Sequence, residues 1–468
     1  MKIIGLKNGA VLQRNQKGKC ETIIYLNDGK TLKTTLGDIS EIGQGKFLLT
    51  GIATGGPYSF SLMVDGKKID YTDVYVGDLW LLGGQSNMEG AGDMTERDFY
   101  DQSHPNEKIR AFYMEDEWRA AEPLLHRLWK SKDKFIAEEW INYRKASKWA
   151  TVDTNETDFL SEDYRGVGPG YAFACEMKKI TGVPQGVIPC AIGGSSMASW
   201  NPDISAGENY YTSMLRRFKE CGGNVRGIYW DQGESECGFS DFEKYTVRMN
   251  RFVEKLREDT GISTLPIVID QIFKCNLPFS VNDQGSHICW SSIKEQQRQL
   301  PEIIKYCDVV STSNAALSDM IHKDSDSQRE IGKNAALAMA ALCSFGGKPG
   351  IKLKGFKVVQ NKIIPFMYTI EVYYENLQGN LKSAGVPNGY SFALSNEEPP
   401  VFYPYKDIKS IKLCGDHVEV KTERSYEEVL NGTLWYGLGH YAVCTITDSE
   451  GRYLPAFGGL KIKDNLLK

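Results

Sequence analysis

The sequence lacks the features of a secreted, membrane-embedded or nucleic-acid-binding protein. Its first nine residues have neither the apolar core nor the small-residue cleavage site of a secretory signal. No apolar stretch is long enough to cross a bilayer, and no run of lysine and arginine could serve as a phosphate-binding tail. The formal net charge of -5 gives no general attraction to nucleic acid or to an anionic membrane. We therefore expect neither a nucleic-acid partner nor a membrane partner.

Paired cysteine motifs are absent as well. The eleven cysteines form no Cys-x-x-Cys pair, and their number is odd, which is typical of reduced thiols in a cytoplasm. We expect a cytoplasmic protein, although a secreted chain whose signal had been removed would begin in the same way. No cluster of histidine and carboxylate residues has the spacing of metal ligands, so we expect neither a metal nor an organic cofactor.

The chain divides into three regions by the pattern of its apolar residues. Residues 1–73 show short alternating strands separated by turns, which predicts a small antiparallel sandwich. In residues 74–346, helical patterns alternate with short apolar runs, the rhythm of a parallel sheet with crossover helices. Residues 347–468 return to a β pattern. The stretch 97–166 is rich in aromatic and charged residues, and it reads as an insertion in the central region.

Apolar runs of the central region end in loops that carry glycine and polar side chains. The first run begins at Val74, and its closing glycines permit the sharp turn that a buried strand needs there. Ligands collect at the carboxyl ends of strands in open α/β sheets. The three loops are Gly84-Gln85-Ser86-Asn87, Gly193-Gly194-Ser195 and Gln232-Gly233-Glu234. A fourth polar segment, Asp319-Met320-Ile321-His322, comes just before the last helix of the region.

These segments hold the parts that a serine needs to hydrolyse an ester. A base must take the hydroxyl proton of Ser86, and His322 suits that task at neutral pH. A carboxylate must orient that base, and Asp319 lies three residues before it, a spacing that one turn can close. The oxyanion of the intermediate needs hydrogen-bond donors. Backbone N–H groups beside glycine and the amide of Gln232 could supply them.

Each part also has an ordinary explanation when it is taken alone. Ser86 could cap a helix, and His322 could be an isolated polar residue. The paired glycines, Asp319 and the triplet that begins at Gln232 could all belong to plain turns. Their order along an alternating β/α segment favours a common site.

The same four motifs resemble the SGNH-hydrolase superfamily. Within it, the chain is similar to the sialate O-acetylesterase family and to the related family 6 acetylxylan esterases. The similarity extends along the chain, to the stretches 9–14, 166–170, 434–437 and 454–457. The resemblance implies a flavodoxin-like, three-layer α/β/α catalytic domain with a parallel sheet over 74–346, with β-rich regions on either side.

The resemblance also implies a role for each motif residue. Ser86 would be the nucleophile, His322 the general base and then acid, and Asp319 its orienting carboxylate. The oxyanion hole would comprise the backbone N–H of Ser86, that of Gly193 or Gly194, and the side chain of Gln232. Glu234 and Asn87 would support the site by hydrogen bonds.

Two positions depart from the family pattern and leave the sugar open. Asp231 stands where an aromatic residue or histidine is usual, and Lys323 stands where many sialate-type members carry proline. We expect a carbohydrate O-acetylesterase that acts on an acetylated sugar, in the first place a sialate O-acetylesterase. A deacetylase of xylan or of another polysaccharide or oligosaccharide is the alternative. A non-catalytic carbohydrate-binding protein is a further one.

Overall fold

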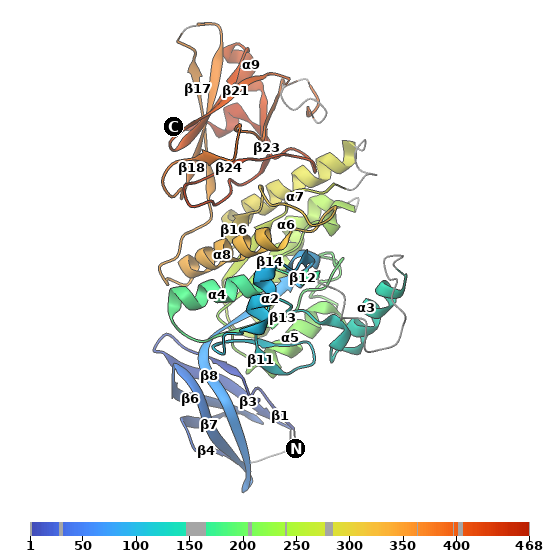
Figure 1. Ribbon diagram of the computed structural model, residues 1–468, viewed down its shortest axis with the longest axis vertical. Coiled ribbons are helices and arrows are strands. Elements are labelled where there is room, and N and C mark those ends of the chain that lie inside the picture. Colours follow the sequence, from blue (N-terminus) through green and yellow to red (C-terminus); the bar gives the residue numbers. More distant parts are fainter. Residues whose placement is uncertain are drawn as a thin grey trace.

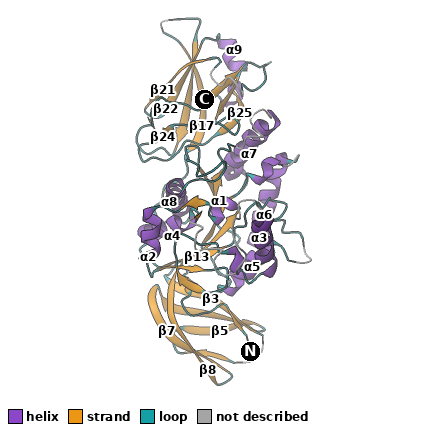
Figure 2. Cartoon of the chain, turned by 45° about the vertical axis from the view of Figure 1, so that its right-hand side comes forward, coloured by secondary structure: helices purple, strands orange, loops and turns teal. Residues whose placement is uncertain are grey.

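Three regions follow one another along the long axis of the molecule (Figure 1). The structure is a computed structural model that describes residues 2–27, 31–146, 165–204, 208–238, 241–276, 284–362, 364–395, 397–400 and 406–467. Strands dominate the two ends of the molecule, and the helices gather around a sheet in its middle (Figure 2). None of the helices in the described ranges combines the length and the hydropathy of a membrane span.

The central region is built on a largely parallel sheet. Its strand order is β11-β10-β13-β8-β14-β15-β16, and only the edge strand β11 is antiparallel to its neighbour. The strands are β8 (Lys67–Gly84), β10 (Ile109–Phe112), β11 (Trp118–Ala120), β13 (Gln185–Pro189), β14 (Gly227–Asp231), β15 (Ile267–Gln271) and β16 (Cys307–Ser311). Strands β13, β14, β15 and β16 are buried along their whole length, and β8 is buried from Val74 to Gly84, as parallel strands covered on both faces are.

Helices cover both faces of this sheet. Alternate residues of β8 point to opposite faces. Trp80 and Leu82 pack with α4 (Gly170–Thr181) and α8 (Ser325–Leu342). Leu79 and Leu81 belong to the core on the other face, with α5 (Tyr210–Glu220), α6 (Tyr245–Thr260) and α7 (Gln284–Ile303). The predicted α/β character of the central region, with a parallel sheet, is therefore present.

The N-terminal region shares β8 with the central sheet. The first half of β8 pairs with β7 (Gly55–Val64), which also pairs with β4 (Leu32–Thr34). A second sheet has the order β1-β3-β6-β5. Its strands are β1 (Ile3–Ile4), β3 (Lys19–Leu26), β5 (Asp38–Gly43) and β6 (Lys46–Ala53), while β2 (Val11–Gln13) runs parallel to β8. The predicted boundary after residue 73 thus lies inside one continuous strand.

The C-terminal region consists mainly of antiparallel strands. One sheet has the order β17-β18-β22-β21, formed by β17 (Lys352–Gln360), β18 (Tyr368–Glu375), β22 (His417–Thr422) and β21 (Ile408–Cys414). A second comprises β20 (Tyr390–Ala393), β23 (Thr433–Tyr436) and β25 (Phe457–Lys461). The remaining elements are β19 (Lys382–Ser383), β24 (Ile446–Thr447), α9 (Tyr426–Asn431) and η5 (Ile462–Asn465). The predicted boundary after residue 346 lies between α8 and β17.

The stretch 97–166 contributes to the sheet as well as to its surroundings. Strands β10 and β11 lie within it, so part of this predicted insertion extends the central sheet. Its other elements are most of α2 (Glu96–Ser103), η1 (Leu128–Lys130), α3 (Lys134–Ala146) and the start of β12 (Arg165–Val167), which pairs with β9 (Gly92–Asp93). Residues 147–164 lie outside the described ranges.

Candidate active site

The polar loops meet at the carboxyl edge of the central sheet. Strand β8 ends at Gly84, and α1 (Ser86–Glu89) begins two residues later. Gly84 has φ +132°, and a Cβ on it would lie 2.1 Å from the carbonyl oxygen of Asp231 at the end of β14. Only glycine permits so close an approach of two neighbouring strands. The turn therefore delivers Ser86 to the edge where ligands bind in such sheets.

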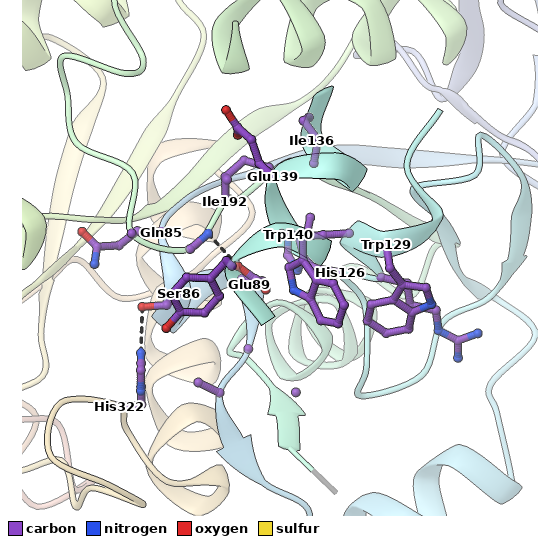
Figure 3. Close-up of a pocket in the computed structure, with 18 of the residues that line it drawn as sticks. Gln85, Ser86, Glu89, His126, Trp129, Ile136, Glu139, Trp140, Ile192 and His322 are labelled. Atoms are coloured by element: carbon purple, nitrogen blue, oxygen red, sulfur yellow. Dashed lines mark hydrogen bonds between the residues drawn. The ribbon is translucent and has the colours of Figure 1, made fainter. Parts of the chain in front are cut away.

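Ser86, His322 and Asp319 form one hydrogen-bonded chain. The Oγ of Ser86 lies 2.9 Å from Nε2 of His322 (Figure 3), and Nδ1 of that ring lies 2.7 Å from Oδ2 of Asp319. The other carboxylate oxygen of Asp319 accepts the backbone N–H groups of Ile321 and His322, each at 2.8 Å. These local bonds close the Asp-x-x-His turn. They fix a tautomer in which Nδ1–H faces the carboxylate and Nε2 accepts from the serine hydroxyl.

The predicted oxyanion donors are placed unequally. Gly193 and Gly194 line the same cavity as Ser86, but the N–H of Gly193 already donates to Oε2 of Glu89 at 2.6 Å. Gln232 is fully buried and does not line the cavity. Its amide donates to the carbonyl of Ser195 at 3.3 Å and to Glu236 at 3.1 Å. The structure therefore does not place the Gln232 amide toward the cavity, because buried acceptors hold it.

Glu89 is a site residue that the sequence did not single out. It lies one turn after Ser86 on α1, so both side chains leave the same face of that short helix. Through Gly193 it ties the nucleophile turn to the loop that follows β13. The spacing of three residues from the serine is a signal that could have found it.

Asn87 and Glu234, predicted as supporting residues, bond to each other. The Nδ2 of Asn87 donates to Oε1 of Glu234 at 2.6 Å, and its Oδ1 accepts the backbone N–H of Lys323 at 3.0 Å. This second bond thus joins Asn87, the residue after the nucleophile, to Lys323, the residue after the base. Burial, and then the charge of Asp231, raise the pKa of Glu234. That carboxyl is therefore easier to keep protonated than an exposed one.

A buried group of charged side chains lies behind this chain of bonds. The Nζ of Lys323 lies 2.7 Å from Oδ2 of Asp231, and both side chains are almost wholly buried. Burial alone would lower the pKa of Lys323, but Asp231, Glu234 and Asp270 together raise it. Burial and then Asp231 raise the pKa of Asp270 well above its usual value, while the hydroxyl of Tyr229 donates to Oδ2 of Asp270 at 2.7 Å. Asp231 and Lys323, the two residues that depart from the pattern of the resembled family, are thus partners in one ion pair.

A cavity of about 830 Å³ opens beside Ser86. The ring centroids of Trp129 and Trp140 lie 5.0 Å apart with a tilt of 43°, and both side chains come from the stretch 97–166 (Figure 3). The carboxylate of Glu139 also lines the cavity, and it accepts a hydrogen bond from the hydroxyl of Tyr210 at 2.7 Å. The wall also contains His126, whose pKa burial lowers to about 3. An imidazole with so low a pKa is a weak base, so His126 is no rival to His322.

Comparison with protein families places the chain in a family. The model of the family described as "Carbohydrate esterase, sialic acid-specific acetylesterase" matches residues 76–341, which is more than half of the chain and includes the whole of the site. The chain belongs to this family. It is thus a carbohydrate acetylesterase of the sialate O-acetylesterase family.

Individual proteins similar to this acetylesterase have low sequence identity to it. A probable carbohydrate esterase of Arabidopsis thaliana, At4g34215, is 27% identical over 287 residues, which cover 57% of this chain and 91% of the relative. The crystal structure of XAC1771, a carbohydrate acetylesterase from Xanthomonas citri, superimposes with a TM-score of 0.69 at 19% identity. That superposition covers 97% of this chain and 98% of XAC1771. The two proteins therefore share a fold over nearly their whole lengths, terminal β regions included.

Proposed function

We propose that the protein removes O-acetyl groups from a carbohydrate through an acetyl-Ser86 intermediate. The observation that carries the proposal is the bonded chain from Ser86 through His322 to Asp319, which opens onto a cavity large enough for a sugar. A serine whose hydroxyl faces an oriented imidazole is an activated nucleophile. Helices on both faces of the sheet support the three-layer arrangement of SGNH hydrolases, which stays a prediction for the central region.

The reaction follows from this geometry in two steps. Ser86 Oγ attacks the acetyl carbonyl while His322 Nε2 takes the hydroxyl proton. The tetrahedral intermediate then collapses, the bond to the sugar oxygen breaks, and the sugar leaves with the proton from His322. A water molecule attacks the acetyl-serine in turn, again through His322, and acetate and free serine result. Asp319 stabilises the imidazolium that forms in both steps.

Backbone groups are the better supported oxyanion donors. The N–H of Ser86 lies in the first turn of α1, where N–H groups have no acceptor within the helix. Gly193 and Gly194 line the cavity beside it. A contribution from the N–H of Gly193 would require Glu89 to release it, and one from Gln232 would require its amide to leave Glu236. We therefore assign the donation of hydrogen bonds to the oxyanion to the N–H of Ser86 and to that of one glycine of this pair.

We propose two classes of acetylated sugar as the substrate. Membership of the family supports a sialic acid as the first substrate. The cavity wall supports a neutral acetylated oligosaccharide as the second, because flat pyranose faces pack well against indole rings. Among the described lining residues, Arg127 is paired with Glu122, which leaves Lys130 as the cation open to a sialate carboxylate.

A panel of acetylated sugars tests these proposals. Acetate release is measured with p-nitrophenyl acetate, O-acetylated sialic acids and acetylated xylo-oligosaccharides, for the wild type and for Ser86→Ala. Release from at least one sugar, lost in Ser86→Ala, is expected. Binding of sugars without any acetate release would instead indicate a non-catalytic carbohydrate-binding protein.

The compartment is also a proposal. All eleven cysteines lie in the described ranges, and all are free thiols. We propose a cytoplasmic enzyme, because free thiols persist in a reducing compartment. Localisation of the tagged full-length protein in its own cell tests this assignment, and accumulation outside the cytoplasm would contradict it.

A further inference from the structure

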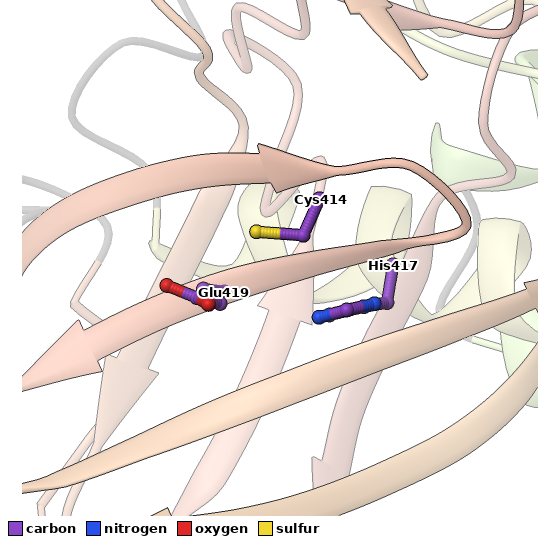
Figure 4. A group of neighbouring side chains, drawn as sticks. All are labelled: Cys414, His417 and Glu419. Carbon is purple, nitrogen blue, oxygen red and sulfur yellow. The ribbon is translucent and has the colours of Figure 1, made fainter. Parts of the chain in front are cut away.

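A second set of chemically capable side chains lies far along the chain, on a hairpin of the C-terminal region (Figure 4). Strands β21 and β22 are joined by a two-residue turn, Gly415-Asp416, which places Cys414 directly opposite His417. Glu419 follows two residues later on β22. Paired residues and residues two apart share one face of a sheet. Val418 and Val420 point into the core, so the other three side chains stand together on the outer face.

The donor atoms of these three side chains are close enough to hold one ion. The Sγ of Cys414, a ring nitrogen of His417 and a carboxylate oxygen of Glu419 all lie within 4.8 Å of one another. Ligands around Zn²⁺, at bond lengths of about 2.0–2.3 Å, are separated by roughly 3.5 Å, so small side-chain rotations would complete the geometry. All three residues are half-buried, which leaves an approach from solvent.

The histidine is already oriented as a metal ligand. Its Nδ1 lies 2.9 Å from Oδ1 of Asp416 in the turn, and its ring stacks on Tyr373 with centroids 4.8 Å apart. A carboxylate on one ring nitrogen fixes the proton there and leaves the lone pair of the other nitrogen for a metal. In Figure 4 the ring extends from β22 toward the same side as the thiol and the carboxylate.

The charges around the thiol favour a cation. The carboxylates Glu419 and Glu371 both lie near the Cys414 thiol, and Lys412 is the cation that opposes them there. Glu371 lies opposite Glu419 on β18, so two acidic residues flank the sulfur. On the same strand, Lys421 Nζ is 3.8 Å from Glu419. A divalent cation would relieve the repulsion between thiolate and carboxylates.

We propose that Cys414, His417 and Glu419 bind one Zn²⁺ ion, with water or Glu371 as the fourth ligand. Sulfur, nitrogen and oxygen donors together match Zn²⁺ and not Mg²⁺ or Ca²⁺, which prefer oxygen alone. The ion would clasp the two strands of the hairpin and plays no part in ester hydrolysis. No metal was predicted from the sequence, because no cluster of histidine and carboxylate residues has the spacing of metal ligands; these three donors come together only when the hairpin pairs its two strands.

Cobalt substitution in the full-length protein tests this site. Co²⁺ bound to a thiolate gives a charge-transfer band in the near ultraviolet, and tetrahedral Co²⁺ gives intense visible bands. One equivalent of Co²⁺ is expected to produce both, and Zn²⁺ is expected to displace it. Cys414→Ser is expected to abolish the charge-transfer band, and Glu419→Gln to weaken binding. Asp416→Asn, which removes the partner of the histidine, is expected to lower affinity roughly ten- to hundredfold.

Matched measurements keep the test decisive. Glu423→Gln changes an exposed carboxylate one residue beyond the end of β22 and is expected to bind Co²⁺ as the wild type does. Hydrolysis of p-nitrophenyl acetate shows that each variant is folded, and it is expected to be unchanged by Cys414→Ser. The proposal is overturned if the wild type gives no thiolate band at one equivalent. It is equally overturned if the band survives in Cys414→Ser, because the metal would then be bound by other cysteines.

Discussion

Lys323 and Asp231 form a buried ion pair that joins the loop of the base to the sheet, with 2.7 Å between Nζ and Oδ2. Lys323 is the residue after His322, and Asp231 is the last residue of β14. The backbone N–H of Lys323 also reaches Asn87, the residue after Ser86. One lysine therefore fixes the positions of the base, the nucleophile turn and a central strand relative to one another.

Removal of the lysine charge is expected to destabilise the protein strongly. Lys323→Met leaves Asp231 buried without its cation, and loss of one partner of a buried pair costs about 3–5 kcal/mol. Denaturant unfolding measures the change in the free energy of unfolding. Lys333→Met removes a half-exposed lysine of α8 that pairs with the exposed Glu330, and it is expected to cost less than about 1 kcal/mol. Equal stability of the two variants would contradict a structural role for the buried pair.

The carboxylate of Asp319 is expected to affect turnover more than binding. Asp319→Asn keeps the size of the side chain but can no longer fix the tautomer or stabilise the imidazolium of His322. We expect kcat to fall roughly 10³-fold or more while KM changes little. Asp326→Asn, an exposed carboxylate in the first turn of α8, is the control. A normal kcat for Asp319→Asn would show that another group orients the base.

The two tryptophans of the cavity are expected to select the sugar and not the ester. Trp129→Ala and Trp140→Ala are each expected to raise KM for acetylated oligosaccharides about tenfold, which corresponds to a loss of about 1.4 kcal/mol of binding. KM for p-nitrophenyl acetate is expected to stay the same, because that ester has no sugar ring to stack. Tyr100→Ala, an exposed aromatic residue of α2, serves as the control. A uniform rise for all substrates would indicate a damaged fold instead.

The buried carboxyl of Asp270 is expected to make stability fall as the pH rises. Its pKa in the folded protein is raised well above that of the unfolded chain. Between the two values the native state binds the extra proton, so each pH unit costs the folded state up to about 1.4 kcal/mol. Asp270→Asn cannot lose a proton and can still accept from Tyr229. Its stability relative to the wild type is therefore expected to increase between pH 5 and pH 8.

Urea unfolding at several pH values in this window measures the effect. Asp203→Asn is the matched control, because Arg251 lowers the pKa of Asp203, which is ionised in both states at these pH values. Its difference from the wild type is expected to be constant with pH. A constant difference for Asp270→Asn as well would contradict the assignment of a protonated Asp270.

The sequence predicted the local parts of the site and missed its long-range ties. Ser86 at a strand end and the turn from Asp319 to His322 depend on neighbours in sequence, so motif and spacing were enough to find them. Gln232 was predicted to donate to the oxyanion, but its amide donates to Ser195 and Glu236 instead, a preference that only packing decides. The bond from Gly193 to Glu89 joins residues about a hundred positions apart, and no local pattern indicates it.

In the fold too, features that depend on local sequence were predicted, and those that depend on long-range pairing were not. The alternation of apolar runs and helices was sufficient to predict the parallel sheet. Strands β10 and β11 are short and lie within a stretch rich in aromatic and charged residues, so their place in the sheet was not apparent. The pairing of Cys414 with His417 likewise depends on the register of a hairpin, which a linear spacing of donors does not show.

Trapping of the intermediate tests the central claim most directly. The wild-type protein is quenched during steady turnover of p-nitrophenyl acetate, digested and analysed by mass spectrometry. One acetyl group on the peptide that contains Ser86, absent from Ser86→Ala together with the activity, is the predicted result. Undiminished acetate release by Ser86→Ala, or an acetyl group that maps to a different residue, would contradict the account.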